Sequence, residues 1–546
     1  MKNNKLMLGA AVACALSVSS VHAVDLQLRN VDPAGVGFND PTPAAPVGGN
    51  AGTTVGEQRL IAYRKALELW GKTLAGDVTV IVRGSFAPLT CDAGGGVLAQ
   101  AGALQIWSDF PNVPLAGHWY GAALANNIAG FDLDGLPLTD PNGDEIVANF
   151  NGNVGQPNCI AGPGWYYGLD STPGTGQIDF LDTFMHEVAH GLGFQNYVSE
   201  ATGVLIGGLP DMYMANTLDL TLGKNWNDPT FFPTPANIIA SALRNGQIVW
   251  SGPQVSANAG VVLGDFNGLG ISGTVSIPEL FFGTAAFGPP ATPDNFSGDI
   301  VQGLDGVIGA PGARVDDGCE PLTIDATGKI VLMYRGLCGF TVKVKNAQNA
   351  GAKAAIIAND GANAGRLFEF GLGGTDPTIT IPSIGIGFAD GNAIVAGTPG
   401  AVAAFYVDPT RLAGTTDGYV RLYAPRTVAP GSSISHYDIT ATPNLLMEPS
   451  ITGSLRANQN LDLTPALMHD IGWQLATLKI GGCDTGVANA LPNGELLHVS
   501  VESCAAGATN SGQFVSCVNT VTNAANKAGL ITGRQKGAIT SCAAKN

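Results

Sequence analysis

The residues best suited to do chemistry lie in one short stretch of the chain, residues 184–194. It contains His186, Glu187 and His190 in the pattern H-E-x-x-H. Residues four apart share one face of an α-helix, so the two imidazoles can bind the same metal ion. The glutamate beside the first imidazole can reach a metal-bound water and act as its general base. The pattern therefore predicts a zinc-dependent hydrolytic site with Glu187 as the catalytic base.

Local sequence signals predict the elements that hold this motif. A helix is expected to begin after Asp179, a good N-cap residue, and to end at the glycines within residues 191–193. An earlier helix is predicted from the capping box at Thr54 to Gly76, followed by a strand over residues 78–82. This order of helix, strands and metal-binding helix is found in zincin peptidases, but it also occurs in many other folds.

A catalytic zinc ion needs a third protein ligand, which the motif alone does not supply. Asn196 stands where the extended motif H-E-x-x-H-x-x-G-x-x-H carries its last histidine, and Asn is a poor zinc ligand beside imidazoles. Glu200 and Asp211 stay open as alternatives, although Glu200 follows the second histidine closely and no motif supports Asp211. The better candidate is His436, far down the chain.

A Leu-Met-Glu-Pro sequence at residues 446–449 follows His436 by about ten residues. With the H-E-x-x-H-x-x-G-F stretch, this arrangement resembles the leishmanolysin-type metzincin peptidases. In that family an insertion displaces the third zinc histidine, and a methionine turn follows it. The resemblance implies that His186, His190 and His436 bind one zinc ion. It also implies that Met447 forms a hydrophobic floor beneath the metal and is not a ligand.

The chain between His190 and His436 is 245 residues long, which is far too long for a loop. A folded domain is therefore predicted inside the site, over residues 278–407. The Arg-Gly-x-Cys-x-Phe turn at 335–340 and the Asn-Ala-x-x-Ala-Gly-Ala helix at 346–352 resemble the protease-associated (PA) domain. Such domains are noncatalytic lids or substrate-binding modules. If the two ends of the insertion lie close together, the separated ligands can still meet.

The predicted fold class is α+β, with a zincin- or metzincin-like catalytic domain built from a mixed twisted sheet and the active-site helix. The inserted PA domain has β/α character, and the C-terminal module is small, helical and rich in disulfides. The expected boundaries are a signal peptide at 1–23, the first part of the catalytic domain at 24–277, the PA domain at 278–407, the second catalytic part at 408–477 and the C-terminal module at 478–546.

The N-terminus has the charged start, apolar centre and small-residue cleavage site of a secretory signal, with cleavage near Ala23. Eight cysteines follow it, and none forms a Cys-x-x-Cys pair. An even number in an exported chain indicates disulfides. Their clustering favours Cys91–Cys159, Cys319–Cys338 and two bonds within the C-terminal module. We therefore expect a secreted or periplasmic protein.

Charge and composition exclude several classes of partner. The net charge is −17 and only 13% of the residues are charged, which argues against nucleic acid and anionic membranes. No later stretch is apolar enough to span a membrane. The acidic turns at 132–135 and 140–144 resemble calcium loops without meeting the EF-hand spacing, so structural Ca²⁺ has only weak support. Nothing in the sequence indicates an oligomeric state.

The sequence thus predicts a secreted zinc endopeptidase that hydrolyses peptide bonds in protein or peptide substrates. One alternative is another zincin arrangement, with Glu200 or Asp211 as the third ligand. A second alternative is a noncatalytic adhesin or binding protein that retains a zincin fold and a PA domain. The intact Glu187 favours the enzyme, because a binding protein has no need of the base.

Overall fold

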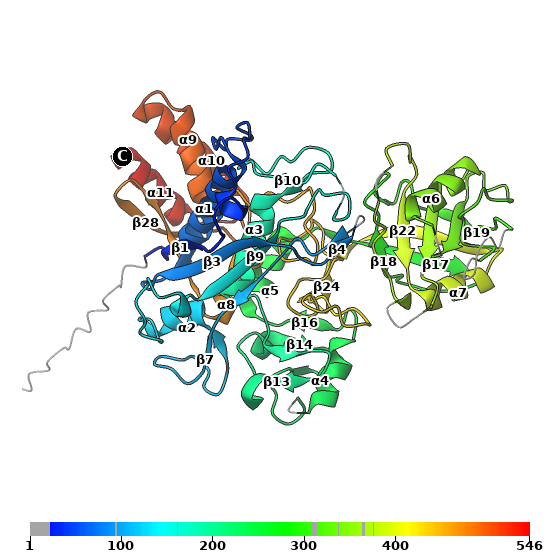
Figure 1. Cartoon of the computed structure of the whole chain (residues 1–546), viewed down its shortest axis with the longest axis horizontal. Helices are drawn as coiled ribbons and strands as arrows, with labels where there is room; N and C mark the ends of the chain where they lie inside the picture. The colour runs from blue at the N-terminus through cyan, green and yellow to red at the C-terminus, as the bar shows by residue number, and fades with distance from the viewer. Residues whose placement is uncertain are drawn as a thin grey trace, which may run out of the picture.

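The structure of the protein is a computed structural model of the whole chain (Figure 1). It describes residues 22–92, 95–160, 162–232, 234–306, 314–336, 338–362, 366–374 and 376–546. The predicted signal peptide lies outside these ranges except for its last two residues. Within the described ranges, no helix has the length and apolar character needed to cross a membrane.

A four-stranded sheet and two long helices form the part of the molecule that carries the H-E-x-x-H motif (Figure 1). The strand order is β1-β3-β9-β6, in which the first three strands are parallel and β6 is antiparallel to β9. The bounds are Leu26–Asn30 for β1, Val80–Ala87 for β3, Ile146–Asn151 for β9, Ala99–Ala103 for β6, Val55–Thr73 for α1 and Phe180–Leu192 for α3.

The first helix begins as its sequence predicts. The Thr54 side chain accepts a hydrogen bond from the Glu57 backbone N–H, and the Glu57 carboxylate accepts one from the Thr54 N–H. This reciprocal pair satisfies two of the N–H groups that every helix start leaves unpaired. The helix ends at Thr73, three residues before Gly76, because Leu74 and Ala75 pair with a strand near the C-terminal module.

Helix α1 fixes the position of α3 through aromatic contacts. The Trp70 indole N–H donates to the Met185 carbonyl at 3.0 Å, although the two residues are far apart in sequence. The Tyr63 and Phe184 rings pack with their centroids 4.0 Å apart. All four of these residues are essentially inaccessible to solvent. Helix α3, which carries the H-E-x-x-H motif, is therefore held against a rigid, tightly packed core.

A second sheet contains strands from both sides of the insertion. Its strand order is β15-β14-β16-β25-β24, with all neighbours antiparallel. Three helices accompany this region, and α8 begins at Thr464 with Leu463 as its N-cap. The bounds are Lys224–Asn225, Thr217–Asp219, Ile248–Trp250, Tyr419–Arg421 and Thr415–Thr416 for the strands in sheet order, and Pro235–Ala242 for α4, Pro253–Val262 for α5 and Thr464–Ile471 for α8.

The insertion is a seven-stranded sheet that stands apart from the first sheet (Figure 1). Its order is β17-β23-β19-β20-β21-β22-β18, flanked by helices α6 and α7. The bounds are Asp265–Gly273, Ala401–Leu412, Gly298–Gln302, Ile330–Tyr334, Ala354–Ala358, Ser383–Ile386 and Phe282–Thr284 for the strands in that order, and Phe340–Asn349 for α6 and Phe388–Ala396 for α7.

The two ends of this sheet unit lie side by side. Strands β17 and β23 form a long antiparallel ribbon in which Asp265 lies opposite Leu412. The sheet therefore spans residues 265–412 and extends beyond the predicted 278–407 at both ends. Because the ribbon brings the entering and leaving chains together, the insertion adds little loop-closure entropy to the fold that surrounds it.

The C-terminal module has its own hydrophobic cluster and docks on α1. Its described residues form three helices and a two-stranded sheet. The Lys72 ammonium pairs with Glu502 at 2.7 Å, and the Asn489 side-chain amide donates to the Lys72 carbonyl. The bounds are Thr477–Ile480 for β27, Cys483–Ala488 for β28, Leu497–Gly507 for α9, Ser511–Lys527 for α10 and Gly533–Lys545 for α11.

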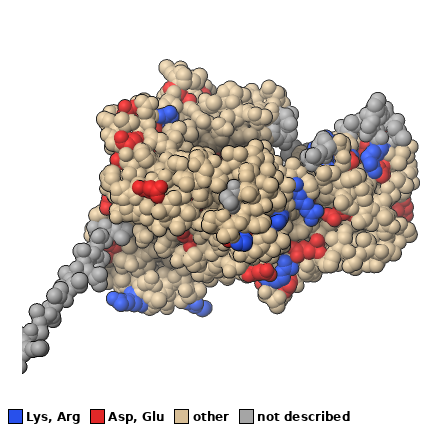
Figure 2. Space-filling view, turned by 90° about the horizontal axis from the view of Figure 1, so that it is seen from below, with Lys and Arg blue, Asp and Glu red and all other residues tan. Residues whose placement is uncertain are grey.

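All eight of the predicted disulfide cysteines are paired within their local regions. The structure confirms Cys91–Cys159 and Cys319–Cys338, and the module contains Cys483–Cys542 and Cys504–Cys517. Charged side chains are sparse on the face drawn in Figure 2, in keeping with the low charged fraction of the sequence. The disulfides fit a secreted or lumenal protein.

Asp144 provides a test of how the first sheet is stabilised. Its fully buried carboxylate receives Nε–H bonds from Arg29 of β1 and Arg83 of β3, each at 2.7 Å. Asp144→Asn should lower the free energy of unfolding by about 2 kcal/mol, because two partly buried guanidinium groups lose their counter-ion. Urea denaturation followed by tryptophan fluorescence measures this loss.

Asp140→Asn is the matched control, because among the described residues the Asp140 carboxylate accepts hydrogen bonds only from Asn142, and an Asn side chain can accept the same bonds. Equal unfolding midpoints for the two variants would contradict the assigned role of Asp144.

Candidate metal centre

Helix α3 is positioned by specific residues at both ends. The Asp179 carboxylate accepts from the Asp182 N–H, which confirms the predicted N-cap. At the other end Gly193 has φ +124°, and a Cβ there would lie 2.6 Å from Cδ1 of Ile471. Only glycine fits this position without strain. The helix therefore ends at Leu192, two residues after His190, and the chain leaves the helix axis at Gly193.

The three predicted histidine ligands meet at one point. The Nε2 atoms of His186 and His190 are 3.1 Å apart, and each lies 3.2 Å from Nε2 of His436. All three side chains are buried. Residues separated by 245 positions in the chain thus form one nearly equilateral triangle of ring nitrogens.

Each imidazole is oriented by a backbone carbonyl on its other nitrogen. Nδ1 of His186 bonds the Leu446 carbonyl at 2.7 Å, Nδ1 of His190 bonds the Phe194 carbonyl at 2.7 Å, and Nδ1 of His436 bonds the Ser432 carbonyl at 2.8 Å. A carbonyl can only accept, so the proton of each neutral ring is on Nδ1. The three Nε2 lone pairs therefore all point at the same place.

This geometry fits a tetrahedral metal ion. Ligand nitrogens at the usual zinc distance of about 2.0–2.1 Å would be about 3.3–3.4 Å apart, close to the separations found here. Three lone pairs at this distance repel one another unless a cation lies between them. Within the described part of the chain these histidines form a group that could hold a metal ion, and imidazole nitrogens suit zinc.

Burial keeps the three rings neutral, as metal binding requires. It lowers the pKa of His186 to about 3, with a further contribution from His190, and the pKa of His190 to about 4. For His436, burial and then the two neighbouring imidazoles lower the pKa well below its usual value. None of the three therefore competes for a proton near neutral pH.

Glu187 is the only carboxylate in the motif and is buried beside the first histidine. Desolvation raises its pKa to about 8, and its carboxylate accepts no hydrogen bond from any described residue. A divalent cation nearby would favour the ionised form. The carboxylate therefore has no hydrogen-bond partner in the described part of the chain.

The loop that carries His436 is tied to the strand β25 region and to the methionine turn. The Tyr423 N–H donates to the His436 carbonyl at 2.9 Å, and the Tyr437 N–H donates to the Met447 carbonyl at 2.8 Å. Met447 is completely buried. Since the Leu446 carbonyl orients His186, the methionine turn contacts both ends of the split site.

Asn196 links the two halves of the site without being a ligand. Its side-chain amide donates to Oγ of Ser435 at 2.8 Å, and its backbone N–H donates to the same oxygen at 3.2 Å. Ser435 directly precedes His436. The residue at the last position of the extended motif therefore holds the loop that supplies the third histidine. The sequence shows this position only as a departure from the pattern.

The two alternative ligands lie outside the histidine group. Glu200 accepts a hydrogen bond from the Asn196 amide, and the Asp211 carboxylate accepts from the backbone N–H groups of Tyr197 and Met214. Neither residue shares the metal-binding group among the described residues. Both carboxylates therefore act in local structure.

The acidic turns considered for calcium have partners in the protein. Asp144 pairs with two arginines, and Asp132 accepts from the Asn126 amide and the Asp134 N–H. In the described ranges these turns form no group that could hold a metal. A separate group of Asp305, Asp317 and Glu320 lies in the insertion, where the buried Lys343 ammonium stands 4.0 Å from the Asp317 carboxylate.

Comparisons with known proteins identify the insertion. The family profile of the PA domain matches residues 296–394, so the chain contains a PA domain. The chain is 34% identical over 117 residues to Signal peptide peptidase-like 3 of Arabidopsis thaliana, covering 18% of this chain and 21% of that protein. It is 34% identical over 114 residues to ER degradation-enhancing alpha-mannosidase-like protein 3 of Xenopus laevis, covering 19% and 12%. The chain thus spans about a fifth or less of these curated relatives.

Solved structures show partial likeness only. A zinc aminopeptidase from Bacillus subtilis shares 23% identity with a TM-score of 0.19, covering 28% of this chain and 36% of that chain. An aminopeptidase from Aneurinibacillus sp. strain AM-1 shares 20% identity with a TM-score of 0.19, covering 29% and 38%. Each of these matches covers less than a third of this chain.

Asn196→Ala should weaken metal binding although Asn196 is not a ligand. Loss of the hydrogen bond from the Asn196 side chain to Ser435 loosens the loop before His436, and we expect the dissociation constant for Zn²⁺ to rise about tenfold. Competition with a chromophoric chelator measures this constant. Ser435→Ala should have a similar effect, and the double variant should be little worse than either single one. Fully additive losses would show that the two side chains act independently.

Proposed function

We propose that the protein is a zinc-dependent endopeptidase in which His186, His190 and His436 bind the metal and Glu187 is the general base. The observation that carries this proposal is the convergence of three Nε2 atoms within 3.2 Å of one another, each oriented by a carbonyl. The free carboxylate of Glu187 beside them supplies the proton acceptor that hydrolysis needs.

The chain's own residues have distinct roles in the proposed mechanism. A zinc ion held by the histidines would polarise the scissile carbonyl and lower the pKa of a water molecule. Glu187 takes a proton from the attacking water and passes it to the leaving amine. The carbonyls of Leu446, Phe194 and Ser432 keep the imidazoles in the tautomer that presents Nε2. The buried surroundings exclude bulk water from these groups.

The resemblance to leishmanolysin-type metzincins agrees with this assignment. Met447 is buried in the turn whose preceding carbonyl orients His186, which suits the proposed floor of the site. We propose further that the catalytic domain is formed by two separated parts of the chain. The seven-stranded insertion that contains the PA domain lies between these two parts. The positions of Asp265 and Leu412 opposite each other support this division.

Internal cleavage of a chain requires a substrate to lie extended across the site. Strand β6 is the last strand of the first sheet and packs against α3. Its outer edge has no strand partner among the described residues. Such an edge can pair with an extended substrate backbone on both sides of the scissile bond. This supports an endopeptidase with protein or peptide substrates, exported through the predicted signal.

Substitutions in the motif separate metal binding from catalysis. Glu187→Gln should retain bound zinc and lower kcat about 10²- to 10⁴-fold, because the base is lost while the ligands remain. His436→Ala should lose zinc and activity together. Bound metal is measured by elemental analysis of the purified processed protein, and activity is measured by casein hydrolysis.

His469→Ala is the matched control, because His469 lies at the end of α8 and outside the metal-binding group. If His436→Ala kept both zinc and activity, the ligand assignment would be wrong. If the wild-type protein bound zinc but cleaved no protein or peptide, a binding function would replace the proposed one.

Substrates with blocked ends and substrates with a free amino terminus distinguish the proposed endopeptidase activity from aminopeptidase activity. A peptide with an acetylated N-terminus, an amidated C-terminus and an internal fluorophore–quencher pair should be cleaved between its ends. Leucine p-nitroanilide, which requires a free amino terminus, should be turned over far more slowly. Mass spectrometry of the products locates the cut, and release of single N-terminal residues only would refute internal cleavage.

A further inference from the structure

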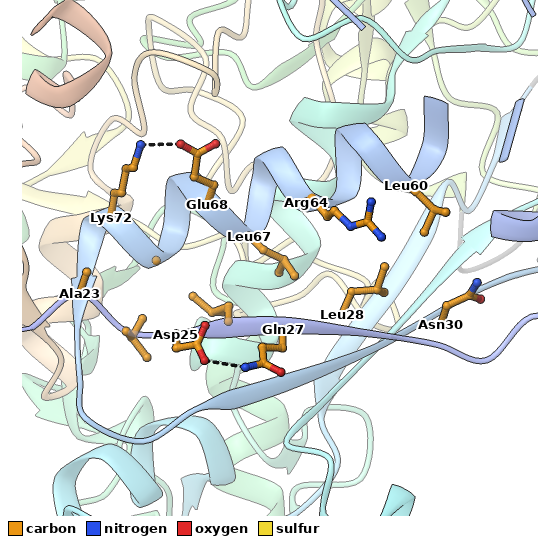
Figure 3. A pocket seen from close by; sticks show the side chains of 13 residues that line it. Ala23, Asp25, Gln27, Leu28, Asn30, Leu60, Arg64, Leu67, Glu68 and Lys72 are labelled. Atoms are coloured by element: carbon orange, nitrogen blue, oxygen red, sulfur yellow. Dashed lines mark hydrogen bonds and ion pairs between the residues drawn. The ribbon is translucent and has the colours of Figure 1, made fainter. Parts of the chain in front are cut away.

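A groove runs between β1 and α1, on the opposite edge of the first sheet from β6 (Figure 3). Its volume is about 610 Å³. Consecutive residues of the strand line one side, over residues 23–28 and Asn30. Every third or fourth residue of the helix lines the other side, including Leu60, Arg64 and Leu67. The groove therefore follows the edge of the strand along most of its length.

The strand presents unpaired backbone groups to this groove. The Asp25 carbonyl accepts from the Val80 N–H, and the Val31 N–H donates to the Gly84 carbonyl, so odd-numbered residues of β1 face β3. The even-numbered residues of β1 must therefore point their backbone N–H and C=O groups away from β3. Leu26 and Leu28 are two such residues, and their backbone groups bond no described residue. This leaves a row of donors and acceptors along an open edge.

The groove combines apolar side chains from the strand and the helix with one free positive charge on the helix. Leu26, Leu28 and Leu60 are only partly buried and pack against the main core. Arg64 is exposed and forms no ion pair or hydrogen bond with any described residue. Figure 3 shows its guanidinium group lying between Leu60 and Leu67, on the side that faces β1.

The other charged side chains that line the groove already form ion pairs or hydrogen bonds within the protein. Glu68 contacts both Lys65 and Lys72. The Asp25 carboxylate accepts hydrogen bonds from the neutral side chains of Gln27 and Thr79. An arriving ligand therefore meets Arg64 as the one cation at the groove that lacks a counter-ion among the described residues. An acidic group is the complementary partner for this charge.

We propose that this groove binds an extended peptide segment of another protein, added as a further strand on the edge of β1. Main-chain hydrogen bonds to Leu26 and Leu28 would hold the peptide. Its alternate side chains would contact the leucines, and an acidic residue among them would pair with Arg64. An open strand edge beside a helix recognises an extended backbone, whereas a compact small molecule leaves the row of N–H and C=O groups unsatisfied.

This site is independent of the proposed peptidase function. Strands β3 and β9 separate β1 from β6 in the sheet, and no histidine lines the groove. A peptide bound here would tether its parent protein without being the segment that is cut. The groove can therefore be tested in a protein whose general base has been removed.

The test uses fluorescence anisotropy with the processed full-length protein carrying Glu187→Gln, which prevents cleavage of the probe. The probe is fluorescein-Val-Thr-Glu-Thr-Val-amide, whose valines and glutamate share one face of a strand. It should bind, and Arg64→Glu should weaken binding about fivefold through loss of an exposed ion pair. The companion probe, with lysine in place of the glutamate, should show the reverse preference.

The reversed preference separates charge pairing from a structural effect of the substitution. A probe N-methylated at its three central residues should not bind, because it cannot pair with a strand edge. Arg64→Glu in the protein with Glu187 intact should leave hydrolysis of the end-blocked peptide unchanged. Failure of the probe to bind the groove would therefore not contradict the metal-site assignment.

Three results would overturn the proposal. The first is the absence of binding at millimolar probe, and the second is equal affinity of both probes for both proteins. The third is a dimer in sedimentation velocity that Arg64→Glu dissociates, because the groove would then be occupied by a second copy of the chain.

Discussion

The site depends on the convergence of three imidazole lone pairs on one point. Neutral rings repel one another in this arrangement, so each must be held by an outside group until a cation compensates for the repulsion. The carbonyls that bond the three Nδ1 atoms provide this restraint. They come from the turn after α3, the loop before His436 and the methionine turn. Correct placement of these backbone segments is therefore what makes the centre available to a metal.

The large insertion does not disturb the placement of these carbonyls, because the first and last residues of the inserted sheet lie next to each other. Its long ribbon of β17 and β23 keeps Asp265 and Leu412 opposite each other, so the PA unit can fold without pulling the two halves apart. The halves are also joined directly, through Asn196 and Ser435 and through the bond from His186 to the Leu446 carbonyl. The three histidines thus belong to one packed body although they are far apart in the sequence.

Much of this organisation is predictable because it rests on local signals. The capping box at Thr54, the cap at Asp179 and the disulfide clustering each involve residues near one another or in a recognisable pattern, and the structure agrees with them. Elements defined by long-range pairing were harder to place. The pairing of β17 with β23 gives no local signal, so the sheet extends past the predicted boundaries of the insertion.

By itself, the sequence determined which side chains could form a catalytic site. They are two histidines and a glutamate at helical spacing, with a third histidine before a methionine turn. Helical periodicity and motif order are properties of the chain alone. Only the tertiary structure decided that His436 meets the other two and that Glu200 and Asp211 do not. The reason is that ligand geometry and carbonyl hydrogen bonds depend on contacts between segments hundreds of residues apart, which no local pattern encodes.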